Sequence, residues 1–122
     1  YRTCGYVKPV IDEIIRYGAD AYHFEGTMKG LTFDICEMKE AIKEKANACL
    51  IAPFDVMHVV REAKPEVIER EVRRTIDVAA EGGGLILGTN VPMMKDVSVE
   101  AMEMMVQAAR KWGRYPLTQR GR

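Results

Sequence analysis

The sequence predicts an α/β fold built from four consecutive βα units. Short apolar runs alternate with amphipathic stretches along the 122 residues, and prolines, capping residues and glycines mark the boundaries. No Asn-Gly hairpin signal interrupts the alternation, which is typical of a parallel sheet with helical crossovers. Two architectures fit this pattern: a doubly wound open sheet, or half of a (β/α)8 TIM barrel that needs roughly 250 residues to close.

The first two units lie in the N-terminal part of the chain. We predict a strand over residues 1–5 (YRTCG) and a helix over 9–18, where a proline begins and a glycine ends an apolar stripe. Residues 19–26 (ADAYHFEG) predict the second strand. Asp34 is placed to cap the next helix, with Glu37 three residues later as in a capping box.

The third unit begins with a continuous apolar run. Residues 47–54 (NACLIAPF) are typical of a strand that is covered on both faces. A short apolar helix is expected over 56–63, and Pro65 opens a longer helix that runs to the three glycines at 82–84.

The fourth unit consists of a strand over residues 84–89 and a helix capped by Ser98 and ended by Gly113. The inner face of this helix is predicted to carry four apolar residues, which are Val99, Met102, Val106 and Ala109.

Composition excludes several classes of function. Eighteen basic residues balance eighteen acidic ones, so no net field draws the chain to nucleic acid or to an acidic membrane, and no apolar run is long enough to span a membrane. Residues 118–122 are expected to be a solvated basic tail. The three cysteines show no C-x-x-C spacing, and no signal peptide is visible, so we expect a cytoplasmic protein.

Both architectures place ligands at the carboxyl ends of the strands. This rule selects Cys4, Glu25, Asp55, Thr89 and Asn90 as candidate site residues. A thiolate at Cys4 is a soft ligand that suits zinc, although a buried inert cysteine is the structural alternative. Glu25 fits a general base, a carboxylate beside a metal or a turn cap, and Asp55 fits either a ligand-binding group or a helix N-cap.

Other side chains carry weaker signals. Met93 follows the fourth strand, where a large flat ligand could lie against it, or it folds back onto the core. His23 is expected to pack inside the sheet with its hydrogen bonds satisfied, and His58 is expected to be exposed. Helix dipoles could lower the pKa of Cys36, and Cys49 is expected to be core.

Four segments together resemble the C-terminal part of the uroporphyrinogen decarboxylase superfamily, which includes cobalamin-dependent methyltransferases. They are YGADAYHFE, ACLIAPFDVMHVV, EVIEREVRRTIDVAAEGGGLILGTNVP and SVEAMEMMVQAARKWGRYPL. The resemblance implies that residues 1–117 form the C-terminal half-barrel of such a domain. It also implies that the chain docks with a missing N-terminal half-barrel or with a second copy.

The resemblance further implies an activity. The leading expectation is a methyltransferase that moves a methyl group between a corrinoid held by a partner protein and a small thiol or methylated substrate. YRTCG resembles the H-x-C-G strand end of these enzymes, which places Cys4 as a zinc ligand, Glu25 as a supporting carboxylate, and Thr89 with Asn90 at the pocket rim. Arg2 replaces the histidine of that pattern, and Thr89 stands where the family carries a second cysteine or the decarboxylases a histidine.

Two alternatives stay open at this point. One is decarboxylation of a porphyrinogen in porphyrin biosynthesis, which needs no metal. The other is a non-catalytic binding or assembly module that keeps the same scaffold. Arg2, Thr89 and the turn APFD at 52–55 all favour it, since the decarboxylase pattern at that turn reads roughly G-N-x-D-P.

Overall fold

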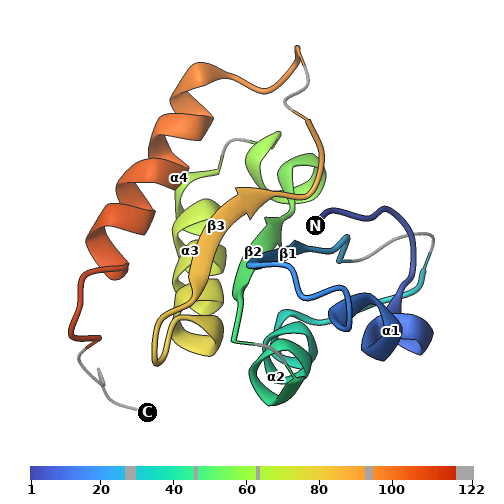
Figure 1. The fold of residues 1–122 in the computed structure, drawn as a ribbon. Coiled ribbons are helices and arrows are strands. Elements are labelled where there is room, and N and C mark those ends of the chain that lie inside the picture. Colours follow the sequence, from blue (N-terminus) through green and yellow to red (C-terminus); the bar gives the residue numbers. More distant parts are fainter. Residues whose placement is uncertain (27–29, 46, 63, 93–94, 118–122) are drawn as a thin grey trace.

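The structure is a computed structural model, and it describes residues 1–26, 30–45, 47–62, 64–92 and 95–117. Helices and strands alternate along these residues (Figure 1). In chain order the elements are η1 (Lys8–Val10), α1 (Ile11–Ile15), β1 (Ala21–His23), α2 (Ile35–Lys45), β2 (Cys49–Phe54), η2 (Val56–Val60), α3 (Pro65–Ala79), β3 (Leu85–Thr89) and α4 (Val99–Trp112).

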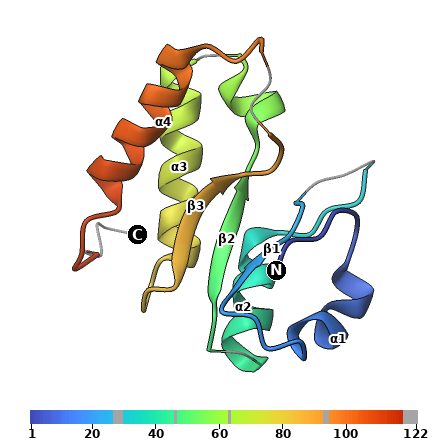
Figure 2. The same ribbon diagram turned by 45° about the horizontal axis from the view of Figure 1, so that its top comes forward.

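The three strands form one parallel sheet in the order β1-β2-β3 (Figure 2). Ala21 pairs with Cys49 at the start of β1, while Leu50 pairs with Leu85 and Phe54 with Thr89 at the two ends of the β2–β3 pairing. The predicted α/β class with a parallel sheet is therefore confirmed. Because the spatial order follows the chain order, each crossover leads to the neighbouring strand.

The strand predicted over residues 1–5 is not formed, so the expectation of four βα units is not confirmed. The segment runs beside β1 through a single parallel bridge between Arg2 and His23. Two backbone hydrogen bonds surround this bridge, from Thr3 N to the His23 carbonyl (3.2 Å) and from His23 N to the Tyr1 carbonyl (2.9 Å). The pairing stops there because Gly5 takes a positive φ of 99°, which turns the chain away from the sheet.

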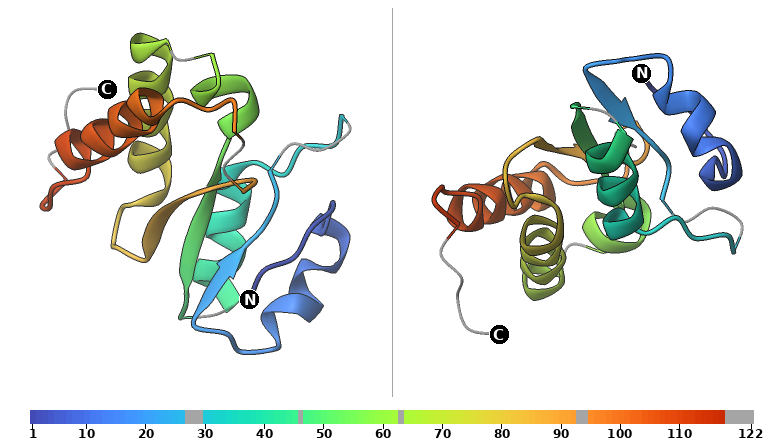
Figure 3. Two further views of the ribbon diagram at one scale, coloured as in Figure 1. Left: turned by 90° about the horizontal axis from the view of Figure 1, so that it is seen from above. Right: turned by 60° about the horizontal axis from the view of Figure 1, so that its bottom comes forward.

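All four α-helices pack against the same face of the sheet (Figure 3). Alternate residues of β2, namely Leu50, Ala52 and Phe54, are buried under them. The core has two clusters: one joins α1 and α2 to β1 and β2, and the other joins α3 and α4 to the end of β2. The opposite face, which we call the open face, carries His23, Ile51 and Ile86, and Ile86 is 49% exposed there.

The helix boundaries follow the predicted signals. Asp34 accepts a hydrogen bond from Cys36 N (2.8 Å), and its own N–H donates to Glu37 Oε2 (3.2 Å), which completes the predicted capping box. Ser98 Oγ accepts from Ala101 N at 3.1 Å, and α3 begins at the predicted proline. The three glycines at 82–84 all have positive φ and form the turn between the end of α3 and the start of β3, where the helix was predicted to stop.

The predicted inner face of α4 is wrong by about one residue. The buried side chains are Ala101, Met105 and Ala108, whereas Val99 and Val106 are exposed. Both stripes of this helix are apolar, so the 3.6-residue period does not decide between them. The cap at Ser98 makes Val99 the first helical residue, and packing against α3 selects the alanine-rich stripe because it allows the two helices to approach closely.

Candidate functional site

The carboxyl ends of the three strands meet at one edge of the sheet and bring four of the predicted residues there. Phe54 and Thr89 are paired at the ends of β2 and β3, and Asn90 N continues the ladder with a 2.9 Å hydrogen bond to the Phe54 carbonyl. Asp55 follows β2 directly, and Glu25 lies two residues beyond β1. This edge is where ligands bind in both architectures that the sequence allows.

Cys4 lies at the same edge, next to Glu25. The bridge between Arg2 and His23 puts these two residues side by side, and Cys4 and Glu25 come two residues further along their segments. Gly5 N donates a 2.8 Å hydrogen bond to Glu25 Oε2, which holds the carboxylate against the turn that follows the cysteine. Cys4 is exposed and in the free thiol form, so it is not the buried inert cysteine of the structural alternative.

His23 occupies the open face behind this pair. Its Nε2 is buried and has no hydrogen-bond partner among the described residues, contrary to the expectation of a satisfied packing histidine. Burial lowers the pKa of His23 because it desolvates the imidazolium, and the Arg2 guanidinium lowers it further. The Thr89 backbone and the Glu25 carboxylate raise the same pKa by smaller amounts, so His23 lies close to the end of β3 as well as to the carboxylate that follows its own strand.

Asp55 is the N-cap of η2, which is one of the two roles predicted for it. Its Oδ1 accepts a hydrogen bond from His58 N (3.1 Å) and caps η2, and its Oδ2 lies 2.8 Å from His58 Nδ1. His58 itself is exposed, as predicted. Asn90 has a comparable role, since its Oδ1 accepts from Val56 N at 3.1 Å and joins the end of β3 to the start of η2.

The described residues do not by themselves make a zinc site. No group of three or more histidine, cysteine, aspartate or glutamate side chains among them is arranged to hold a metal ion. Cys4 and Glu25 supply two donors of the kinds that zinc takes, but a closed or catalytic zinc site needs three or four protein ligands. Met93, which was predicted to contact a flat ligand, lies outside the described residues.

Cys36 and Cys49 both differ from expectation, the first in its pKa and the second in its burial. The pKa of Cys36 is raised, not lowered, because desolvation and the nearby Glu40 carboxylate disfavour its thiolate more than the helix terminus favours it. Cys49 at the start of β2 is half-buried on the open face, where the sequence had placed it in the core.

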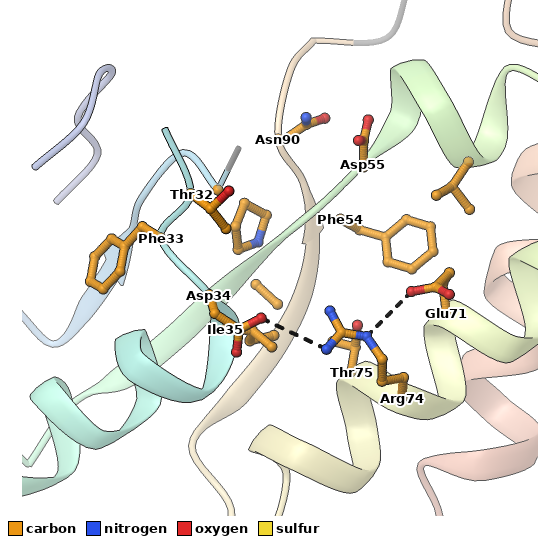
Figure 4. Close-up of a pocket in the computed structure, with 14 residues that line it drawn as sticks. Thr32, Phe33, Asp34, Ile35, Phe54, Asp55, Glu71, Arg74, Thr75 and Asn90 are labelled. Carbon is orange, nitrogen blue, oxygen red and sulfur yellow. Dashed lines mark hydrogen bonds and ion pairs between the residues drawn. The ribbon is translucent and has the colours of Figure 1, made fainter. Parts of the chain in front are cut away.

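A cavity of about 230 Å³ opens beside this edge, between the end of β2, the start of α2 and the middle of α3 (Figure 4). Asp55 and Asn90 lie at one end of it. Arg74 lies at the other end, where its NH1 is 3.8 Å from Asp34 Oδ2 and its Nε is 3.3 Å from Glu71 Oε2. The cavity therefore has two polar ends that are joined by apolar walls.

Sequence reasoning missed the Arg74 end of the cavity. The helical spacing of the apolar residues in α3 correctly indicates its buried stripe, which consists of Ile68, Val72, Ile76 and Ala79. The signal that could have been used is Thr75, a polar residue within that stripe, which is only 7% exposed.

A model of the uroporphyrinogen decarboxylase (URO-D) family matches residues 2–112 of the chain. A search of curated proteins returned no match. In the described residues, no helix is both long and apolar enough to cross a membrane.

Proposed function

The chain belongs to the uroporphyrinogen decarboxylase family, and from this premise we propose that it forms one wall of the active site of a methyltransferase of the superfamily. The methyl group would move between a corrinoid held by a partner protein and a small thiol or methylated substrate. The residues proposed to carry the site are Cys4 and Glu25, with Thr89 and Asn90 at its rim.

One observation carries this proposal: an exposed thiol lies at the ligand-binding edge with a carboxylate held beside it. Cys4 is exposed, and the Gly5 N–H fixes Glu25 next to it at 2.8 Å. Cysteine at this point of an H-x-C-G-like segment supports the methyltransferase branch, since the resemblance places sulfur chemistry there. Thr89 departs from both branches, since it replaces the histidine of the decarboxylases and the second cysteine of the methyltransferases, so it does not discriminate between the two activities.

The residues of this chain would act on the sulfur atom of the substrate. A thiol must lose its proton before its sulfur can form a bond to the methyl carbon, because the thiolate is the nucleophile. Glu25 supplies a carboxylate within the site that can take this proton, and Gly5 orients it through Oε2. The buried, unpartnered Nε2 of His23 offers a second polar contact on the open face.

The family also implies zinc, and the donor set described above does not fit it. A metal held by Cys4 and Glu25 needs at least one more ligand from outside the described residues. We therefore assign no step of the reaction to zinc. The corrinoid would supply or accept the methyl group, and its partner protein remains part of the proposal.

The half-barrel architecture is part of the same proposal. Sequential parallel strands with all helices on one face are the arrangement found along the wall of a (β/α)8 barrel, whereas a doubly wound sheet carries helices on both faces. The open face, with Ile86 exposed, would then be the barrel interior. Docking with an N-terminal half-barrel or with a second copy would cover it, and a cytoplasmic location stays a prediction.

Decarboxylation of a porphyrinogen is the second candidate, and the family match is equally compatible with it and with methyl transfer. The two candidates can be separated with the intact protein. One assay follows methyl transfer from methylcobalamin to a small thiol, and the other follows carbon dioxide release from uroporphyrinogen. Methylation without decarboxylation supports the proposal, decarboxylation without methylation overturns it, and neither activity favours the non-catalytic module.

A further inference from the structure

We propose that two copies of this chain pair through one flank of α4, with the two helices antiparallel about a two-fold axis. This flank lies on the helix side of the sheet, away from the open face. The inference therefore goes beyond the proposed function and does not depend on methyl transfer. It rests on an apolar stripe that no described residue covers and on two unpaired charges beside that stripe.

The apolar stripe is the one that the sequence predicted to be the inner face of α4. Its members follow the spacing of a helix–helix seam and are Val99, Met102, Val106 and Ala109. Val99 is 70% exposed and Val106 is 45% exposed, while Met102 and Ala109 are half-buried at the border of the core. Because α4 packs on α3 and η2 and ends the row of helices, no described helix lies against this flank (Figure 2).

Two charged residues border the stripe on its solvent side. Glu103 and Arg110 are both exposed, and neither side chain has an ion-pair partner in the part of the chain that the structure describes. Seven residues separate them, so they lie on the same side of the helix and about 10 Å apart along its axis. The stripe is therefore accompanied by one negative and one positive charge that are both available to a partner.

These charges make the flank complementary to itself in one orientation. When two α4 helices pair antiparallel about a point between residues 106 and 107, Glu103 of each copy lies opposite Arg110 of the other. Parallel pairing would instead place like charges opposite each other, which is unfavourable. The charge pattern therefore favours a second copy of this chain, held antiparallel, as the occupant of the stripe.

Sedimentation velocity of the intact protein tests this pairing. A stripe of about three helical turns is a small interface, so we expect a monomer–dimer equilibrium with a Kd on the order of 10 µM. Val106→Asp buries a charge at the centre of the interface in both copies and is expected to raise the Kd about fiftyfold. Val78→Asp is the matched control, because it makes the same change at an exposed valine of α3, and it should leave the Kd within about twofold.

A charge swap tests the antiparallel orientation. Glu103→Arg and Arg110→Glu are each expected to weaken the dimer about tenfold, because each replaces two attractive pairs with two repulsive ones. The double variant exchanges the signs within both pairs and is expected to restore the Kd to within about threefold. Circular dichroism of all variants verifies that they are folded.

Three results would overturn the inference. The unsubstituted protein could remain monomeric up to about 200 µM, well above the expected Kd. It could also form a dimer whose Kd is the same in Val106→Asp, which would place the interface elsewhere on the molecule. A double variant that associates no more tightly than the single charge variants would rule out the antiparallel pairing. None of these results bears on methyl transfer, which is measured separately.

Discussion

Replacing Asn90 by alanine tests whether this residue holds the site together. Its Oδ1 accepts the Val56 N–H at 3.1 Å, and Val56 is fully buried. Asn90→Ala leaves this buried donor without its acceptor, which costs about 1–3 kcal/mol. With an m-value of about 1.5 kcal/mol/M, a loss of about 2 kcal/mol lowers the urea midpoint by about 1.3 M. Urea unfolding followed by circular dichroism measures the midpoint, and amide hydrogen exchange at Val56 reports the local bond.

Two comparisons make this prediction decisive. Asn90→Asp keeps an oxygen acceptor and is expected to recover more than half of the lost stability, while the exposed Asn47→Ala is expected to change it by less than about 0.5 kcal/mol. If Asn90→Ala unfolds at the original midpoint with unchanged exchange at Val56, Asn90 is a rim residue without a structural role, and the reasoning from its hydrogen bond is refuted.

Three further predictions concern other parts of the sheet and α2. Burial lowers the pKa of His23 below its ordinary value of 6.5, so its contribution to the free energy of unfolding is fully present above pH 6.5 and is lost as the pH falls through the folded-state pKa. His23→Asn should therefore reduce the difference in unfolding free energy between pH 7 and pH 5.5. An unchanged difference would contradict the burial of this imidazole. Gly88→Ala would place a Cβ 2.8 Å from Ile51 Cγ2 and should lower the free energy of unfolding by about 1–3 kcal/mol, as measured by thermal unfolding. Gly26→Ala is the control, because the nearest atom to its Cβ would be 3.7 Å away, and it should be tolerated. Equal effects of the two substitutions would refute the close packing of β2 and β3 at Gly88. Glu40→Gln should speed alkylation of Cys36 by iodoacetamide at pH 8, because the Glu40 carboxylate raises the pKa of that thiol. An unchanged alkylation rate would show that Glu40 does not contribute to the raised pKa of Cys36.

Local signals in the sequence were sufficient for most of the fold. The capping box at Asp34, the cap at Ser98 and the proline at the start of α3 each act within one helical turn, so their effect is readable without knowing the tertiary structure. The predicted strand over residues 1–5 failed because a strand needs a sustained partner, and pairing ends after Arg2 where Gly5 turns the chain. The face of α4 failed because two apolar stripes compete, and only contact with α3 chooses between them.

The candidate site was predictable in position but not in detail. The rule that strand ends converge placed Glu25, Asp55, Thr89 and Asn90 at one edge. It left open whether Asp55 caps η2 or binds a ligand, and it could not show that Asn90 holds η2, because the Asn90–Val56 hydrogen bond joins residues that are far apart in the chain. The ion pair of Arg74 with Asp34 likewise joins α2 to α3 and has no sequence signature.

The most direct test of the proposed function is the rate of methyl transfer from methylcobalamin to a small thiol, followed through the cobalt absorption spectrum, in the intact protein and in two cysteine variants. Cys4→Ser is expected to lower the rate at least a hundredfold, because it removes the one exposed thiol beside Glu25. Cys36→Ser, at an exposed thiol on α2, is expected to leave the rate within twofold. Equal rates in Cys4→Ser and the unsubstituted protein would contradict the account.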